Sequence, residues 1–267
     1  MAGRTAYLRR ARHWIANRGW RGFLDEVWYR LRLKLQRKPV PGRENGNTRP
    51  HPFDVAYGVD TGGLLWGEAL ERPRSEDAAY WATGYYGISP SAFTAAMNRL
   101  HLDWPRYTFV DIGCGKGRAL LLALRFPFRR VLGVELSPAL AAVAAQNLEY
   151  FRAQWRQAGV PAEAVAGDAT RFPLPNGPLL LFLYHPFATP VMKRFLAHLR
   201  EAAEQEERDV YMLYANPELE AMVAGTPGFE LMWKQLFSLT TEEGAADRFG
   251  SYGEMFAAFR LAGQSER

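Results

Sequence analysis

Apolar and polar residues follow one another in short blocks along the second half of the chain, and the blocks predict strands that alternate with helices. Runs rich in Val, Ile, Leu, Phe and Tyr have the length and composition of strands, and they cover residues 107–113, 129–136, 162–169, 178–186, 209–217, 229–239 and 252–261. Helical patterns cover residues 116–126, 137–159, 189–207 and 217–225. This alternation is typical of an α/β fold with a parallel sheet. The last two strands are joined by a polar loop without a predicted helix, so we expect an antiparallel hairpin at the sheet edge.

The first 107 residues divide into two parts. Residues 1–38 are predicted to be helical because apolar side chains recur on one helix face, and a stretch rich in Pro, Gly and Asn follows. Residues 51–107 mix aromatic with loop-forming residues and contain one predicted helix, at 89–100. We therefore predict a basic helical N-terminal extension and linker (1–50), a lid- or cap-like helical segment (51–107) and an α/β domain (108–267).

The charge of the chain is concentrated in the N-terminal extension. Residues 1–43 contain twelve Lys or Arg and two acidic residues, whereas the rest of the chain has more acidic than basic residues. Such asymmetry fits a solvated helix, and it also allows contact with anionic lipid or with nucleic acid. No run of 18 apolar residues and no secretory signal pattern are present, and the single cysteine, Cys114, excludes an internal disulfide framework and a cysteine-based zinc site. We therefore expect no metal and a cytoplasmic location, which leaves room for peripheral contact with a membrane.

A glycine-rich stretch, FVDIGCGKGR, joins the first strand of the α/β domain to its first helix. Gly113, Gly115 and Gly117 would let backbone N–H groups approach a ligand that side chains would obstruct. The spacing is G-x-G-x-G, one residue shorter than the G-x-G-x-x-G of dinucleotide-binding proteins, which argues against an NAD-dependent oxidoreductase. Asp111, two positions before the first glycine, suits a cationic ligand better than a pyrophosphate.

Two further acids end the second and third predicted strands. Glu135 lies near the spacing expected of a carboxylate that accepts hydrogen bonds from ribose hydroxyls, and Asp168 could accept one from an adenine amine. Because the carboxyl ends of parallel strands meet at one edge of a sheet, these acids and Asp111 should line the same edge. That edge would suit a cation that carries adenosine.

Four segments in this order, VDIGCGKGRALL, GVELSPAL, AGDAT and LFLYHPF, resemble the class I S-adenosylmethionine-dependent methyltransferases over about residues 80–262. The resemblance implies a Rossmann-like seven-stranded sheet, mostly parallel with an antiparallel C-terminal edge strand and flanked by helices. It also implies S-adenosylmethionine as cofactor, methyl transfer as activity and residues 108–267 as the methyltransferase domain. By the same resemblance the cofactor-binding residues are Asp111, Gly113, Gly115, Gly117, Glu135, Asp168, Ala169 and Tyr184.

The motif after the fourth strand departs from the resemblance. Methyltransferases that act on amines often have N-P-P-Y or D-P-P-F here, whereas this chain has Tyr184, His185, Pro186 and Phe187. His185 could act as a general base, since its pKa is near neutral, or it could be a structural histidine at a strand end. Tyr184 could pack beside the sulfonium, where the face of an aromatic ring can meet a cation. We take His185 and Tyr184 as the candidate catalytic residues.

The acceptor of the methyl group is left open by the sequence. A small molecule is favoured, because residues 51–107, including Tyr85 and Tyr86, look enclosing and aromatic. A protein lysine or an RNA base is the alternative, supported only by the basic N-terminal extension. From a different class, a non-catalytic S-adenosylmethionine sensor or interaction module would have the same fold without the chemistry.

Overall fold

The computed structural model describes residues 51–65, 84–155, 159–206, 208–247 and 251–261. The chain divides into two compact units, residues 1–49 and 50–267, and all described residues belong to the second. The predictions made for residues 1–50 therefore lie outside the described residues.

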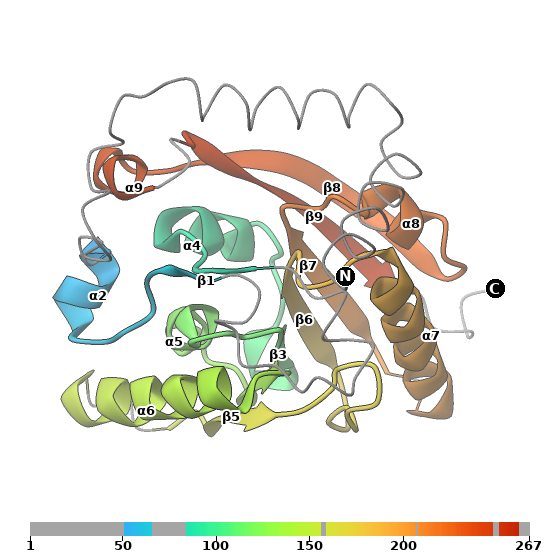
Figure 1. Cartoon of the computed structure of the whole chain (residues 1–267). Helices are drawn as coiled ribbons and strands as arrows, with labels where there is room; N and C mark the ends of the chain where they lie inside the picture. Colours follow the sequence, from blue (N-terminus) through green and yellow to red (C-terminus); the bar gives the residue numbers. More distant parts are fainter. Residues whose placement is uncertain (1–50, 66–83, 156–158, 207, 248–250, 262–267) are drawn as a thin grey trace, which may run out of the picture. The chain divides into compact units, whose positions relative to one another are not determined.

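A single seven-stranded sheet forms the centre of the second unit (Figure 1). Its strands are β3 (Thr108–Ile112), β4 (Arg130–Glu135), β5 (Ala162–Ala166), β6 (Leu179–Tyr184), β7 (Val210–Ala215), β8 (Phe229–Ser238) and β9 (Gly253–Leu261). They lie in the order β5-β4-β3-β6-β7-β9-β8, and β9 is antiparallel to both of its neighbours. The predicted fold is confirmed: the sheet is mostly parallel with an antiparallel pair at one edge. Within that pair β9 lies between β7 and β8, so β8 is the outermost strand.

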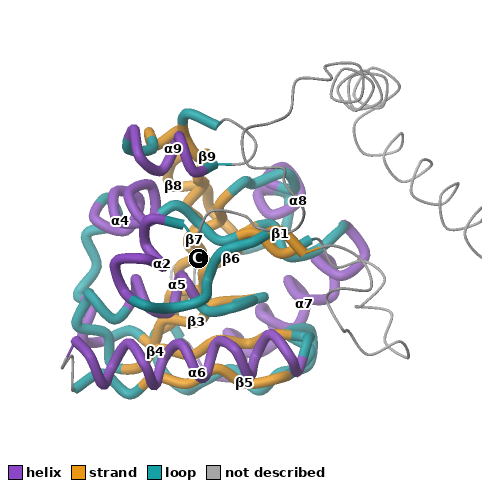
Figure 2. The backbone as a smooth tube through the Cα atoms, turned by 60° about the vertical axis from the view of Figure 1, so that its left-hand side comes forward, coloured by secondary structure: helices purple, strands orange, loops and turns teal. Residues whose placement is uncertain are grey.

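Helices cover both faces of the sheet, and the two faces have separate apolar cores. The helices are α2 (Pro52–Tyr57), α4 (Pro90–Asn98), α5 (Arg118–Ala123), α6 (Pro138–Trp155), α7 (Thr189–Glu206), α8 (Glu220–Ala224) and α9 (Thr241–Ala246), with a short 3₁₀ turn, η2 (Trp104–Arg106). The core beneath α4, α5 and α6 contains Phe109 and Phe182, and the core beneath α7 contains Val110 and Leu181. The two cores follow from the alternation of side chains along each strand. Figure 2 shows α6 lying along β4 and β5.

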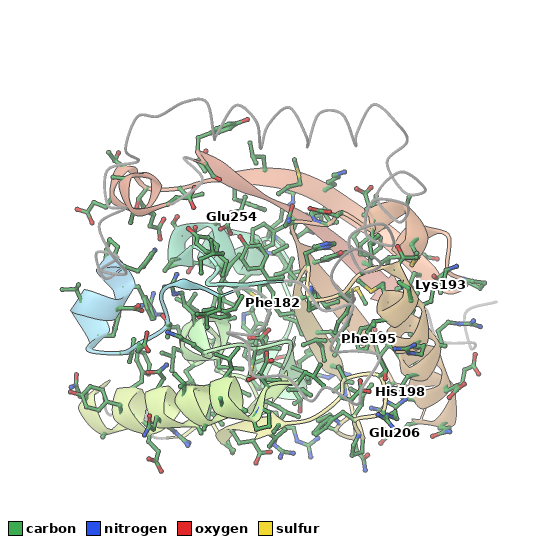
Figure 3. The ribbon with its side chains drawn as sticks, viewed as in Figure 1. Phe182, Lys193, Phe195, His198, Glu206 and Glu254 are labelled. Atoms are coloured by element: carbon green, nitrogen blue, oxygen red, sulfur yellow. The ribbon has the colours of Figure 1, made fainter. Side chains whose placement is uncertain are left out.

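Aromatic side chains fill the core beneath α4. Phe93 of α4 meets Phe182 edge-to-face with ring centres 5.1 Å apart, and Phe109 lies 6.1 Å from each of them. In Figure 3, Phe182 is labelled on this side of the sheet, and Phe195 is labelled on α7. This packing fixes the position of β6 and of the residues that follow it.

The connection between β8 and β9 contains a helix that the sequence analysis did not predict. Thr240 and Glu243 form a capping box at the start of α9: Thr240 Oγ1 accepts a hydrogen bond from Glu243 N, and a Glu243 carboxylate oxygen accepts one from Thr240 N. Because this pattern satisfies two backbone donors at a helix start, T-x-x-E was the signal that could have identified α9. The prediction of a helix-free polar loop was wrong.

Candidate active site

The glycine loop follows β3 and begins α5, and two of its glycines face crowded surroundings. Gly113, Gly115 and Gly117 all have positive φ, at 78°, 54° and 86°. A Cβ atom on Gly113 would lie 2.8 Å from Pro186 Cβ, and one on Gly115 would overlap the ring of Tyr85. Glycine is therefore needed both for backbone conformation and for close packing.

Glu135, at the end of β4, is fixed by the backbone around it. One of its carboxylate oxygens accepts a hydrogen bond from Gly115 N and the other from Ser137 N, each at 2.9 Å. These bonds orient a buried carboxylate toward the glycine loop.

Asp111, on the adjacent strand β3, is also buried, and no described residue donates a hydrogen bond to its carboxylate. Burial raises the pKa of Asp111 well above its ordinary value, and the nearby Glu135 carboxylate raises it further. Burial and the same two carboxylates raise the pKa of the Cys114 thiol, so Cys114 is not an activated nucleophile. A cation placed between Asp111 and Glu135 would relieve the repulsion between them.

Asp168 lies just past the end of β5 and is held in a tight turn. Its carboxylate accepts hydrogen bonds from Thr170 N at 2.9 Å and Thr170 Oγ1 at 2.8 Å, and Arg171 pairs with its second oxygen. Burial alone would raise the pKa of Asp168, but the bonds from Thr170 and Arg171 outweigh it and hold the pKa below its ordinary value. The carboxylate is therefore ionised and oriented.

One cavity connects these groups at the carboxyl ends of the parallel strands. Among the residues proposed from the sequence, its lining includes Asp111, Gly113, Glu135, Asp168, Ala169 and Tyr184. Gly115 and Gly117 are not part of the lining, but Gly115 N holds Glu135 and Gly117 precedes α5. The three acids thus converge as predicted, and Tyr85 and Tyr86 of β2 (Tyr85–Tyr86) close the cavity from the side of the segment before the sheet.

His185 is placed differently from the other residues proposed from the sequence. Its backbone has a positive φ of 40°, and its side chain is not among those that line the cavity. The ring instead lies 2.8 Å from the Tyr214 hydroxyl through Nδ1 and 3.5 Å from a Glu218 carboxylate oxygen through Nε2. Tyr214 belongs to the core beneath α7, on the opposite face of the sheet from Phe182. This geometry supports the structural alternative, and a base role for His185 remains an untested prediction.

Arg118, immediately after the glycine loop, was not recognised in the sequence. Its buried guanidinium donates to Thr61 Oγ1 at 2.7 Å and to the carbonyls of Gly87 and Ile88, and it lies 3.6 Å from the buried Asp54 carboxylate. Arg118 therefore ties α5 to two separate parts of the segment before the sheet. The local sequence gave no sign of these partners, which are 30 to 64 positions away in the chain.

A second connection holds the same segment. Asn147 of α6 accepts a hydrogen bond from Asp60 N and donates to the carbonyls of Asp60 and Lys116. Tyr85 donates its hydroxyl hydrogen to Thr61 O at 2.6 Å. The short ribbon of β1 (Leu64–Leu65) and β2 is thus held beside the glycine loop.

Two kinds of site are not found among the described residues. No described helix is long and apolar enough to cross a membrane. Nor does any group of three or more His, Cys, Asp or Glu within the described ranges have the arrangement to hold a metal ion.

A glycine loop and strand-end carboxylates around one cavity form the arrangement that α/β folds use to bind nucleoside cofactors. Residues 109–206 match the family model described as a methyltransferase domain. This match agrees with the resemblance of the four sequence motifs to the class I S-adenosylmethionine-dependent methyltransferases.

Solved structures of methyltransferases resemble this chain at low sequence identity. Magnesium protoporphyrin IX methyltransferase from Synechocystis, with bound S-adenosylmethionine, is 16% identical, with a TM-score of 0.42 over 64% of this chain and 77% of that one. An S-adenosylmethionine-dependent methyltransferase from Geobacter sulfurreducens, in complex with S-adenosylhomocysteine, is 14% identical, with a TM-score of 0.43 over 66% of this chain and 92% of that one. A TehB-like methyltransferase from Corynebacterium glutamicum is 18% identical, with a TM-score of 0.40 over 65% and 88%. A search of curated proteins found no significant match.

Proposed function

We propose that the chain transfers the methyl group of S-adenosylmethionine to a small-molecule acceptor, with Asp111, Glu135 and Asp168 holding the cofactor. The observation that carries this proposal is the pair of buried carboxylates, Asp111 and Glu135, beside a glycine loop. Such a pair is unfavourable until a cation lies next to it. The amino and sulfonium groups of S-adenosylmethionine supply positive charge that a neutral nucleoside lacks.

Each acid has a distinct proposed role. Asp111 and the loop of Gly113, Gly115 and Gly117 would contact the amino-acid end of the cofactor. Glu135, already oriented by Gly115 N and Ser137 N, would accept hydrogen bonds from the ribose hydroxyls. Asp168 and Ala169, at the end of β5, would contact the adenine.

The lining of the cavity favours a small acceptor. Tyr85, Tyr86, Phe182 and Tyr184 make its wall aromatic and enclosing. Its charged lining is mostly acidic, with Asp111, Glu135 and Asp168 against one base, Arg118, which already pairs with the buried Asp54. An acidic wall repels phosphate groups, which argues against an RNA backbone in the site. The alternative of a protein lysine or an RNA base still depends on the basic charge of residues 1–43.

Methyl transfer requires the protein mainly to position the acceptor and the cofactor. The methyl donor is already activated, so the site must hold the acceptor atom within about 3–3.5 Å of the methyl carbon and in line with the bond that breaks. Positive charge on sulfur is lost as the methyl leaves, so no new anion needs stabilising. Residues 51–107 would serve as the lid or cap that encloses the reacting groups, and residues 108–267 as the methyltransferase domain.

The location and the second function class are also proposals. The single cysteine supports a cytoplasmic location, and the basic residues 1–43 would permit peripheral contact with an anionic membrane. A cofactor sensor without catalysis is the alternative class. Methyl transfer to any acceptor would separate the two, since both would bind the cofactor.

Calorimetric titration of the full chain with S-adenosylmethionine and with NAD tests the cofactor, and a screen with a labelled methyl donor then tests transfer to small acceptors. We expect binding of S-adenosylmethionine but not of NAD, and label in a small molecule. Binding without transfer to any small acceptor, protein or RNA would support the sensor.

Replacing Asp111 with Asn is expected to weaken the binding of S-adenosylhomocysteine by about 1–3 kcal/mol, because the ammonium group of the ligand loses its charged partner. The same change should stabilise the ligand-free protein at neutral pH. The raised pKa of Asp111 means that ionisation lowers the stability of the folded chain as pH rises through that pKa, and asparagine stays neutral.

Thermal unfolding from pH 3 to 8, with and without ligand, measures both effects. The gain in stability should vanish below about pH 4, where the carboxyl is protonated in the folded and unfolded chain alike. A variant that is less stable than the wild type at pH 7 and binds the ligand equally well would contradict both roles.

A further inference from the structure

Glu254, near the start of β9, is a buried carboxylate that the cofactor site does not use. Asn216 N, just past β7, donates to Met255 O, so Glu254 lies at the carboxyl end of the parallel strands, where the cavity is. One oxygen, Oε1, accepts hydrogen bonds from Ser89 Oγ at 2.9 Å, from Ser89 N at 3.3 Å and from the Tyr184 hydroxyl at 3.3 Å. Figure 3 labels Glu254 on the same side of the sheet as Phe182.

The other oxygen of Glu254, Oε2, is buried and has no hydrogen-bond partner among the described residues. Only 9% of the residue is exposed, and a buried polar atom without a partner lowers stability. Burial raises the pKa of Glu254 to about 7, against the opposing effect of the hydrogen bonds from Ser89 and Tyr184, and the Asp247 carboxylate raises it slightly further. Glu254 can therefore gain and lose a proton near neutral pH.

The charged and titratable groups around Glu254 come from three other elements. Tyr184 ends β6, Asp247 follows α9, and Tyr86 of β2 donates its hydroxyl hydrogen to Asp247. Tyr184 and Tyr86 both line the cavity that contains Asp111 and Glu135. The Tyr184 hydroxyl thus links the cavity to Glu254.

We propose that Tyr184 and Glu254 form a proton-accepting pair: the Tyr184 hydroxyl contacts an N–H or O–H group of the methyl acceptor, and Glu254 receives the proton through it. The proposal rests on the proposed function and adds a catalytic residue, Tyr184, and a residue that acts through it, Glu254. It also gives Tyr184 a role beyond packing against the sulfonium.

The proton transfer balances without any further reactant. The acceptor heteroatom forms a bond to the methyl carbon while the carbon–sulfur bond breaks and its electron pair stays on sulfur. The acceptor's proton passes to the Tyr184 oxygen as the Tyr184 proton passes to the Glu254 carboxylate. Burial raises the pKa of Tyr184, and Glu254 raises it further, so the tyrosine remains neutral and only relays the proton. Glu254 then releases the proton to solvent, which its near-neutral pKa permits.

The same groups define the chemical class of the acceptor. Glu254 and Asp247 add negative charge behind Tyr184 and Tyr86, which line a cavity that contains three acids, Asp111, Glu135 and Asp168, and one base, Arg118. A carboxylate or phosphate group next to the reacting atom would be repelled. The acceptor is therefore a neutral or cationic molecule with an N–H or O–H nucleophile, such as an amine, an imidazole or a phenol.

The first part of the test measures the pair without any acceptor. Full-chain wild type, Glu254→Gln and Tyr184→Phe are titrated with S-adenosylhomocysteine by calorimetry, and all three should bind with similar affinity. Infrared difference spectra of the bound wild type against Glu254→Gln should contain a protonated-carboxyl band that disappears as pH rises through about 7. Absence of that band would overturn the proposal, whereas absence of binding by the wild type would overturn the proposed function itself.

The second part follows transfer of labelled methyl from S-adenosylmethionine to benzylamine, imidazole and phenol as probes. Wild-type turnover should rise with pH through about 7, and Glu254→Gln should slow it about 100-fold or more, with the KM for S-adenosylmethionine unchanged. Glu254→Asp should restore part of the rate. Tyr184→Phe should slow turnover to the same extent as Glu254→Gln.

Ser89→Ala is the matched control, because Ser89 donates to Glu254 but its side chain makes no capping bond to α4. Loss of this donor raises the pKa of Glu254 further, so the variant should reach the wild-type maximal turnover only at higher pH and turn over more slowly at pH 7. If Glu254→Gln has the same turnover and the same pH profile as the wild type, the proposal is overturned. Transfer to none of the three probes by a wild type that binds the cofactor would overturn it as well.

Discussion

Replacing Arg118 with Met is expected to lower the free energy of unfolding by about 3–5 kcal/mol, because the change leaves the Asp54 carboxylate buried without a charged partner. It also removes the donors to Thr61, Gly87 and Ile88, which hold the segment before the sheet beside the glycine loop. Urea unfolding followed by circular dichroism measures the loss. Affinity for S-adenosylhomocysteine should fall as well, since Gly87 and Ile88 line the cavity.

Two variants make the test of Arg118 specific. Arg130→Met removes an arginine whose pair with Glu163 is nearly half exposed on both sides, so the expected loss is only about 0–1 kcal/mol. Adding Asp54→Asn to Arg118→Met removes the unpaired charge and should recover part of the stability. Equal losses in Arg118→Met and Arg130→Met would contradict the proposed tether.

Replacing Gly115 with Ala is expected to damage both stability and cofactor binding. The added Cβ would overlap the buried Tyr85 ring, and overpacking of this kind lowers stability by about 1–3 kcal/mol. The positive φ of 54° adds a strain of about 1 kcal/mol or more for alanine. Tyr85 cannot move aside freely, because its hydroxyl bonds Thr61 O. Since Gly115 N orients Glu135, affinity for S-adenosylhomocysteine should fall too.

Gly58→Ala provides the matched control for Gly115→Ala. Gly58 has a similar positive φ, of 64°, and the nearest atom to an added Cβ, at 3.1 Å, belongs to the half-exposed Tyr150 ring, which can move aside, so the control reports mainly the backbone strain. The double variant Tyr85→Ala with Gly115→Ala removes the overlap, and its loss should be smaller than the sum of the two single losses. If Gly115→Ala is no less stable than Gly58→Ala in thermal unfolding, the described packing of Tyr85 on the loop is wrong.

Features that depend on local pattern could be predicted from the sequence. Strand and helix periods located the seven strands, and Asp111, Glu135 and Asp168 could be placed together because parallel strands end at one edge. The need for glycine at Gly115 was also predicted, as room for a ligand, whereas its contact with Tyr85 was not. The capping box of Thr240 and Glu243 is present in the sequence as T-x-x-E, but the helix that it indicates was not predicted.

Features that depend on distant contacts could not be predicted. Glu254 meets Tyr184 across 70 positions and Arg118 meets Asp54 across 64, and neither pair leaves a periodic signal. The orientation of the His185 side chain could not be predicted either. Tyr184 lines the cavity, but the positive φ of the next residue, His185, directs its ring toward Tyr214 instead. Likewise, the position of β9 between β7 and β8 depends on which strands pair, and the apolar pattern of a single strand does not predict its partners.

Because burial and the Glu135 carboxylate raise the pKa of Asp111, a cationic cofactor bound beside it should lower that pKa again and release protons from the carboxyl group. Calorimetry of S-adenosylhomocysteine binding between pH 5 and 8, in buffers with different ionisation enthalpies, counts the protons exchanged. The account predicts a net release by the wild type and by Glu254→Gln, and its loss in Asp111→Asn. Equal proton exchange in the wild type and in Asp111→Asn would contradict it.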